Sequence, residues 1–171
     1  MSTLKVTPVR HVLMTIAVLA VTTTHLFAQT TVLRDEAFEV TLPPGFLPAQ
    51  PTKAADASGI DYTSQGPGGI ARVQHQIFSD EQTPDASQVY ESIKSSVKEG
   101  MNLDSAVEFT HQGRPALRMT ISMPTLNQVM RMECVLVGPR LYRVWYITRT
   151  TAELETPAVR AFFDSFRIKG L

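Results

Sequence analysis

Apolar and polar residues alternate along most of the chain beyond residue 37, and this two-residue period is typical of β-strands with one buried face. The strands that the alternation predicts cover residues 38–42, 60–64, 70–78, 106–111, 116–123, 129–137 and 141–149. Short turns rich in glycine and proline separate the later strands in pairs, which predicts three hairpins. Residues 47–59 have no period and predict a surface loop.

Two other segments carry apolar residues at three- and four-residue steps, which predicts amphipathic helices. The first should begin at an N-cap Thr83, followed by Pro84, and stop at Gly100. The second opens with Thr156 as its cap and Pro157 at its first position. Its apolar side consists of Val159, Phe162, Phe163 and Phe166. Strands followed by packed helices predict an α+β fold with a mostly antiparallel sheet.

The pattern also predicts which strand residues are buried. Residues 135–137 are consecutive and apolar, which favours a central strand covered on both faces. Cys134 shares the apolar face of residues 130–136 and is expected to be a buried small hydrophobe. It is the only cysteine in the chain, so no internal disulfide can form. His75 falls on the apolar face of its strand.

The first 28 residues have the pattern of a cleavable signal peptide. Lys5 and Arg10 form a basic start, and an uncharged apolar run follows over residues 12–21. That run is short of the roughly 20 residues that span a bilayer, so a retained signal anchor is the weaker alternative. Cleavage is expected after Ala28, with Leu26 at the third position back. The protein should then be periplasmic or secreted, with no membrane span after cleavage.

Removal of residues 1–28 from the 171-residue chain leaves 143 residues, 29–171, a suitable size for one domain with a single core. The removed part carries two of the 16 basic residues and none of the 16 acidic ones, so the mature chain has 14 bases and 16 acids. A nearly neutral chain without a basic run argues against nucleic-acid binding.

Three segments together resemble a known family. They are the strand and turn at 38–46, the hairpin at 135–144 and the closing helix and tail at 162–168. They are similar to the corresponding parts of small secreted bacterial domains with the PsbP-like α/β/α sandwich fold. The resemblance implies a mostly antiparallel sheet of about six to seven strands flanked by helices over residues 29–171. It implies no catalytic residues, because the shared positions serve packing, and most relatives act by binding partners.

Metal chemistry has few candidates in the mature chain, where only His75 and His111 remain. No pair of ligands has the short spacing of a zinc site. The two histidines could meet across a sheet with Asp61 or Glu108, although a core histidine is the simpler interpretation of His75. No metal or cofactor is therefore assigned.

Other catalytic and ion-binding patterns are equally weak. No serine lies in a glycine-flanked elbow, although Asp164-Ser165 could approach His111. The run Gly66-Pro67-Gly68-Gly69 lacks the lysine and the helix that follow a phosphate-binding loop, so a hairpin turn is favoured. The acidic residues Asp80, Glu81, Glu153 and Glu155 do not match a calcium loop and are expected to flank helices.

Three hypotheses for function follow. The first is a non-catalytic binding or accessory module for an envelope protein or membrane-associated complex. Its discriminating feature would be an exposed apolar or aromatic patch, for instance around Trp145, which shares its strand with Tyr142 and Tyr146. The second is a carrier of a small apolar ligand or lipid, suggested by the methionines at 119, 123, 130 and 132. The third is an enzyme, which requires a histidine, an acid and a nucleophile in one cleft.

Overall fold

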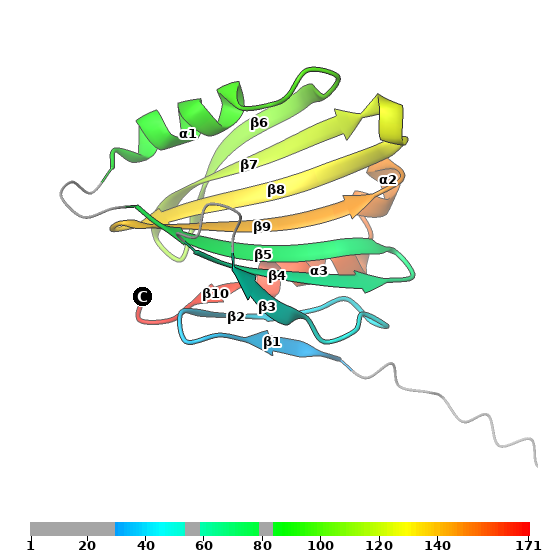
Figure 1. Cartoon of the computed structure of the whole chain (residues 1–171), viewed down its shortest axis with the longest axis horizontal. Coiled ribbons are helices and arrows are strands. Elements are labelled where there is room, and N and C mark those ends of the chain that lie inside the picture. The colour runs from blue at the N-terminus through cyan, green and yellow to red at the C-terminus, as the bar shows by residue number, and fades with distance from the viewer. Residues whose placement is uncertain (1–29, 54–58, 79–83) are drawn as a thin grey trace, which may run out of the picture.

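The structure is a computed structural model that describes residues 30–53, 59–78 and 84–171 (Figure 1). Ten strands are β1 Val32–Arg34, β2 Phe38–Thr41, β3 Gln50–Lys53, β4 Gly59–Gly66, β5 Gly69–Ile77, β6 Asn102–His111, β7 Arg114–Met123, β8 Gln128–Val137, β9 Arg140–Thr148 and β10 Arg167–Ile168. The α-helices are α1 Ala86–Ser95, α2 Thr151–Leu154 and α3 Pro157–Ser165, and a 3₁₀ turn spans Pro124–Leu126. The predicted signal peptide, Asp80, Glu81 and Thr83 lie outside the described residues.

A seven-stranded antiparallel sheet forms the centre of the protein, in the order β3-β4-β5-β9-β8-β7-β6. The three predicted hairpins are confirmed as β4–β5, β6–β7 and β8–β9. The strand that contains residues 135–137 is central as predicted, and Val135 and Leu136 are buried in different cores. Because side chains alternate along each strand, the sheet presents two faces that need separate cover.

A second, three-stranded sheet and α3 cover one face (Figure 1). In this sheet β2 pairs with both β1 and β10. Phe38 of β2 and Phe162 of α3 are fully buried among the aromatic side chains of this first core. The aromatic rings of Phe38 and Tyr62 meet edge to face, with 5.5 Å between centroids. This face of the central sheet is therefore closed along most of its length.

The opposite face is covered by α1, a single helix of 10 residues (Figure 1). Its Tyr90 and Ile93 pack on apolar side chains of β7, β8 and β9 to form a second core. The Tyr90 hydroxyl donates to the Pro115 carbonyl oxygen at 2.7 Å and accepts from the Leu136 amide at 3.2 Å. The last pair of the β7–β8 ladder at this end is Ala116 with Val135, next to Pro115 and Leu136 in the sequence. Tyr90 therefore joins the two strands where their own pairing stops.

Three strands were absent from the sequence prediction, namely β1, β3 and the two-residue β10. Residues 47–59 are not all loop, because β3 pairs with β4 over Gln50–Lys53. All four of its side chains are exposed and one is Pro51, so it has no apolar alternation to detect. β1 likewise buries only Leu33 of its three residues. β6 also starts earlier than predicted, at Asn102 instead of residue 106, because a bulge between Leu103 and Ser105 interrupts its alternation.

The helix boundaries also need correction. α1 begins at Ala86, with Asp85 as the N-cap, and the Asp85 carboxylate accepts a hydrogen bond from the Gln88 amide at 3.0 Å. It ends at Ser95, so the predicted stop at Gly100 comes too late. Thr156 is the N-cap residue of α3, but its hydroxyl donates to the Glu153 carbonyl oxygen and does not cap the helix.

Two further predictions concern burial. Cys134 is fully buried, as expected for a small core hydrophobe, and burial raises the pKa of its thiol to about 12. His75 is 7% exposed and lies on the buried face of β5, also as expected. No helix in the described part of the chain is long and apolar enough to cross a membrane.

Candidate binding groove beside α1

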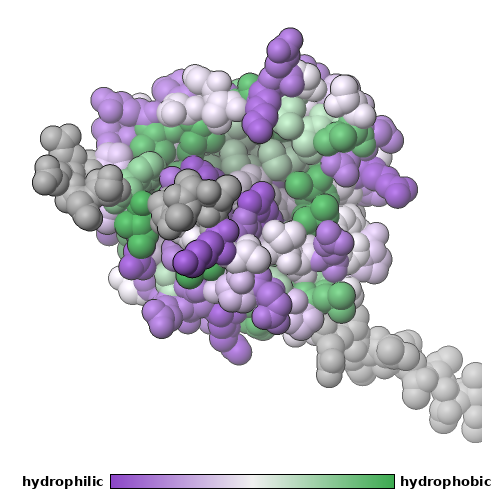
Figure 2. Space-filling model, in the orientation of Figure 1, coloured by the Kyte–Doolittle hydropathy of each residue, from purple (hydrophilic) through white to green (hydrophobic). Residues whose placement is uncertain are grey.

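The face of the central sheet beneath α1 is divided into an apolar half and a polar half. On β7, β8 and β9 it carries mainly leucine, isoleucine, methionine and Trp145. On β4 and β5 the positions in register carry Asp61, Arg72, Gln74 and Gln76. Figure 2 shows a band of hydrophobic side chains below the helix, with polar side chains beneath it. A partner on this face would meet both kinds of surface.

The polar half is held in place by charge-assisted hydrogen bonds. Arg72 bonds the Asp61 carboxylate through Nε, at 2.8 Å to each oxygen, and through a second guanidinium nitrogen. The Arg72 guanidinium also lies over the Trp145 ring, 4.8 Å from its centroid. Arg143 donates to the amide oxygens of Gln74 and Gln76, at 3.1 and 3.0 Å. Fixed polar groups of this kind can orient a ligand or a partner.

A pocket of about 270 Å³ lies where α1 meets this boundary. Its apolar wall consists of Phe78, Pro84, Val89, Ile93 and Leu141, and its polar wall of Gln76, Gln88, Ser92 and Arg143. We call this pocket and its rim the α1 groove. The volume lies just below the roughly 300–1,000 Å³ of sites that enclose a drug-sized ligand. It can accommodate one or two side chains of a partner.

The three aromatic residues of β9 do not form an exposed patch. Trp145 faces α1 but is only 9% exposed, so the exposed patch that would mark a binding module does not lie around it. Arg72 and its core neighbours cover the ring. Tyr142 and Tyr146 point to the opposite face and belong to the first core. From this strand the α1 groove takes Leu141 and Arg143 instead.

Three of the four methionines pack in or against the second core. Met119, Met123 and Met132 are buried, and Met130 packs against the same cluster while partly exposed. Their flexible side chains close the space between β7, β8 and α1. Their position therefore gives no support to a ligand cavity among them.

His75 lies beside an acid and a phenol, but in the first core. Its Nε2 is 3.9 Å from Asp35 Oδ1, and the Tyr62 hydroxyl donates to Asp35 Oδ2 at 2.5 Å. Burial lowers the pKa of His75, and burial together with Asp35 raises the pKa of Tyr62 to about 12. Among the described residues, neither ring nitrogen of His75 has a hydrogen-bond partner. The group is thus a neutral core histidine beside a protonated tyrosine.

His111 and the Asp164-Ser165 pair serve packing and helix termination. The His111 ring lies 5.4 Å from the Phe166 ring, and burial lowers its pKa. The Ser165 hydroxyl donates to the Phe162 carbonyl oxygen and accepts from the Thr41 amide, both at 2.9 Å. Ser165 therefore ties α3 to β2.

The predicted acidic ligands have other partners. Asp61 is bound to Arg72, and the Glu108 carboxylate lies 3.7 Å from Lys94. Within residues 30–53, 59–78 and 84–171, no group of three or more histidine, cysteine or acidic side chains could hold a metal ion.

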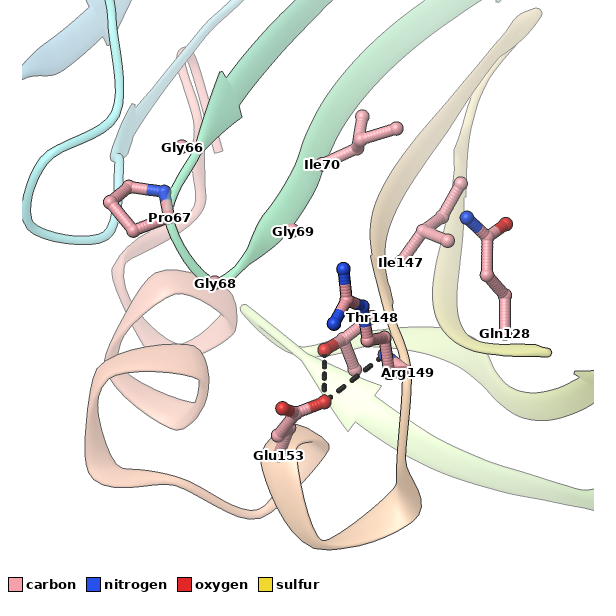
Figure 3. Close-up of a pocket in the computed structure, with 10 residues that line it drawn as sticks. All are labelled: Gly66, Pro67, Gly68, Gly69, Ile70, Gln128, Ile147, Thr148, Arg149 and Glu153. Carbon is pink, nitrogen blue, oxygen red and sulfur yellow. Dashed lines mark hydrogen bonds between the residues drawn. The ribbon is translucent and has the colours of Figure 1, made fainter. Parts of the chain in front are cut away.

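The glycine-rich run 66–69 forms the turn of the β4–β5 hairpin, in agreement with the prediction. Gly69 has a φ of +145°, and a Cβ there would lie 2.1 Å from the Ile147 carbonyl oxygen. The turn borders a pocket of about 300 Å³. Figure 3 shows the Glu153 carboxylate turned across this pocket to the Thr148 hydroxyl, 2.6 Å away, and the Arg149 amide, 3.1 Å away. Glu153 thus caps α2, and local donors occupy its Oε2.

A cluster of charged side chains between the sheet and α3 was not predicted. Arg118 donates to Glu133 at 2.7 Å, and Arg131 pairs with Glu155. Only 7% of the Glu133 side chain is exposed, and burial raises its pKa despite the opposing effect of Arg118. The cluster borders a pocket of about 280 Å³ together with Arg160 and Asp164. In the sequence these are ordinary polar positions of alternating strands, and only the packing of α3 shows that they are covered.

Comparison with known proteins bears on the fold. No family model matches the sequence, and no curated protein matches it. The chain is similar to the solution structure of cyanobacterial PsbP from Synechocystis sp. PCC 6803, with 12% identity and a TM-score of 0.59 over 82% of this chain and 93% of that one. A Pseudomonas aeruginosa protein of unknown function is 15% identical over 73% of this chain and 85% of its own, with a TM-score of 0.40, too slight a likeness to support an argument.

The central sheet and the elements packed on its two faces define an α+β protein with a mostly antiparallel sheet. Its fold is PsbP-like, as the segments at 38–46, 135–144 and 162–168 suggested. At this level of identity the similarity establishes the architecture alone, because one fold can serve many functions.

Proposed function

We propose that this protein is an exported, non-catalytic module that binds a protein partner in the cell envelope through the α1 groove. The observation that carries the proposal is the composition and size of that groove. One wall is apolar, the other is polar and fixed by hydrogen bonds, and the volume of about 270 Å³ suits a side chain better than a whole lipid. Apolar anchors inserted into such pockets commonly dominate protein recognition.

Two other observations support the absence of catalysis in this proposal. Among the described residues, the histidine beside an acid and a hydroxyl is His75, which is 7% exposed and lies in the first core. A pKa near 12 makes the Tyr62 hydroxyl a poor nucleophile at neutral pH. Export is supported by the basic and apolar pattern of residues 1–28, with the periplasm or the exterior as the proposed location.

Site-specific photo-crosslinking in cells tests the groove. A photoreactive amino acid at Ser92, which lines the groove, should give one reproducible adduct with an envelope protein. The matched control is Ser87, an exposed serine of the same helix about 140° away around its axis. The expected result is an adduct from position 92 and none from position 87. Absence of any protein adduct at 92, or equal adducts from both positions, overturns the proposal.

A further inference from the structure

The outer edge of the central sheet at β6 is open. β6 is last in the strand order, and among the described strands only β7 pairs with it. Eight of its ten residues are exposed, and Val107 is 55% exposed. Every second residue of an edge strand presents its backbone N–H and C=O groups outward, so such a strand is a template for another one.

Most of this edge lacks the usual protection against pairing. The bulge between Leu103 and Ser105, with Asp104 inside it, interrupts only the first part of the strand. From residue 105 to 111 the register with β7 is regular, and this stretch contains neither proline nor lysine, with Glu108 as its one acidic residue. Natural edge strands are commonly blocked by such residues. The regular stretch is therefore available for strand addition.

We propose that a second copy of this chain pairs with β6 in antiparallel orientation, about a two-fold axis through Val107. This inference is independent of the α1 groove. Val107 would face Val107 of the other copy, Ser105 would face Phe109, and Ala106 would face Glu108. All five positions belong to the regular part of the strand. Cross-strand neighbours of this kind contribute to sheet stability when they are apolar or complementary.

Charge selects this register over its neighbours. Directly opposed side chains of two antiparallel strands point to the same face of the sheet. A two-fold axis perpendicular to the sheet must therefore lie between one residue and the same residue of the other copy. An axis through Glu108 would place two carboxylates opposite each other, and an axis through Ala106 would oppose Asp104 and Glu108. Like charges directly opposite are destabilising. The axis through Val107 opposes no like charges, and Lys94 lies 3.7 Å from Glu108 to balance it.

An axis through Phe109 would also avoid like charges, but the surroundings disfavour it. Phe109 is only partly exposed, and the Arg118 guanidinium already lies 4.8 Å from its ring centroid. The end of the strand and the turn after it are engaged as well, because His111 packs on Phe166 and the Gln112 side chain bonds the Ile168 backbone. Val107 has more apolar surface to bury.

Cysteine self-crosslinking tests the axis directly. In Val107→Cys of the full chain the two Cβ atoms would be about 5 Å apart, close to disulfide range. Mild oxidation should give a covalent dimer on a non-reducing gel. Thr110→Cys is the matched control, because its two copies would be about 20 Å apart. The buried Cys134 is common to both variants. A dimer from position 110 as readily as from 107, or none from 107, overturns the register.

Sedimentation velocity tests whether the contact sustains a dimer without a covalent bond. Val107→Lys would place two ammonium groups on the axis and should raise the dimer dissociation constant at least about tenfold. Leu126→Lys makes the same change at another exposed apolar position, 60% exposed, and should leave the constant unchanged. Ala106→Lys would oppose Glu108 and should tighten the dimer. A monomeric wild-type chain at 100 μM, or equal effects at 107 and 126, overturns the proposal.

Discussion

At the scale of single residues, the buried titratable groups decide how stability depends on pH. His75 is 7% exposed, and burial lowers its pKa, with Arg140 acting in the same direction and Asp35 against it. The protonated form is therefore disfavoured in the folded chain. A group with a lowered pKa in the folded state contributes stability that is complete above its unfolded pKa and is lost as the pH falls.

We expect the free energy of unfolding to fall as the pH is lowered from 7 below the ordinary histidine value of 6.5. One histidine contributes at most about 1.4 kcal/mol per pH unit. His75→Leu should reduce the dependence, and the remaining part should come from His111, whose pKa burial also lowers. Urea unfolding of the wild type and of His75→Leu at pH 7.5 and pH 5.0 measures the loss of unfolding free energy in each. Equal losses in wild type and variant would contradict the assignment.

The contribution of Glu133 to the free energy of unfolding has the opposite pH dependence. Burial raises its pKa and Arg118 lowers it, so the ionised carboxylate costs stability as the pH rises above its ordinary value of 4.5. Arg118→Met removes the compensating cation and should destabilise the protein by about 3 kcal/mol at pH 7. This value lies at the low end for a broken buried pair because Arg118 is 42% exposed.

Two comparisons separate this effect from lost packing. The stability lost in Arg118→Met should be smaller near pH 4.5, because Glu133 can then be protonated and leaves no buried charge unpaired. The double variant Arg118→Met, Glu133→Leu should approach wild type, because no buried charge is left unpaired. Urea unfolding of the single and double variants gives the coupling energy. A double variant as unstable as the single one would show that packing, and not charge, dominates.

At the scale of elements, α1 is attached by a buried polar contact of Tyr90 as well as by its apolar side. The Tyr90 hydroxyl joins Pro115 and Leu136 beyond the last β7–β8 pair. Burial raises the pKa of Tyr90, so the hydroxyl keeps the proton that it donates. The helix thus completes the hydrogen bonding of two strands, in addition to covering them.

Tyr90→Phe should cost about 1–3 kcal/mol, because the buried Leu136 amide loses its hydrogen-bond partner while the ring remains. Chemical unfolding measures the loss, and an unchanged circular dichroism spectrum would show that the fold persists. Ser87→Ala, an exposed change on the same helix, is the control and should stay within about 0.5 kcal/mol of wild type. A Tyr90→Phe variant as stable as this control would contradict the bridging role.

Elements whose stabilising interactions are local were predictable from the sequence. The hairpins have alternating patterns and turn residues, and α3 has an apolar side ending at Phe166. β3 was not predictable, because four exposed residues with a proline pair only through the backbone. The residues that line the α1 groove were missed for a related reason. Phe78, Val89 and Leu141 come together only when the helix docks on the sheet, and no local spacing encodes that contact.

At the scale of the whole molecule, one sheet separates two cores with different degrees of closure. The first core is enclosed by β1, β2, β10 and α3, and it contains His75 and the tyrosines of β9. The second is covered by one helix, beside which the groove remains. Packing therefore accounts for most of the residues that looked functional in the sequence. The surfaces proposed for binding lie where the cover ends, at the side of α1 and along β6.

The hydrogen bonds of the first described residues bear on the predicted export. The Thr31 carbonyl oxygen accepts from the Leu42 amide at 2.8 Å, and its hydroxyl donates to the Phe46 carbonyl oxygen at 3.3 Å. Cleavage after Ala28 would leave Gln29 and Thr30 ahead of these bonds, so the signal peptide could be removed without loss of β1. A cut inside β1 would remove strand pairs that hold β2 in place.

We therefore expect the exported chain to begin at Gln29 and to unfold at the same urea concentration as a chain produced from residue 29. Intact mass of the protein released from the periplasm identifies the first residue. Ala28→Leu should slow processing, because the residue before the cut must be small, and should enrich the uncut form in the membrane fraction. If the wild-type chain itself stays uncut and membrane-bound, the signal-anchor alternative is correct, and the module would work tethered to the membrane.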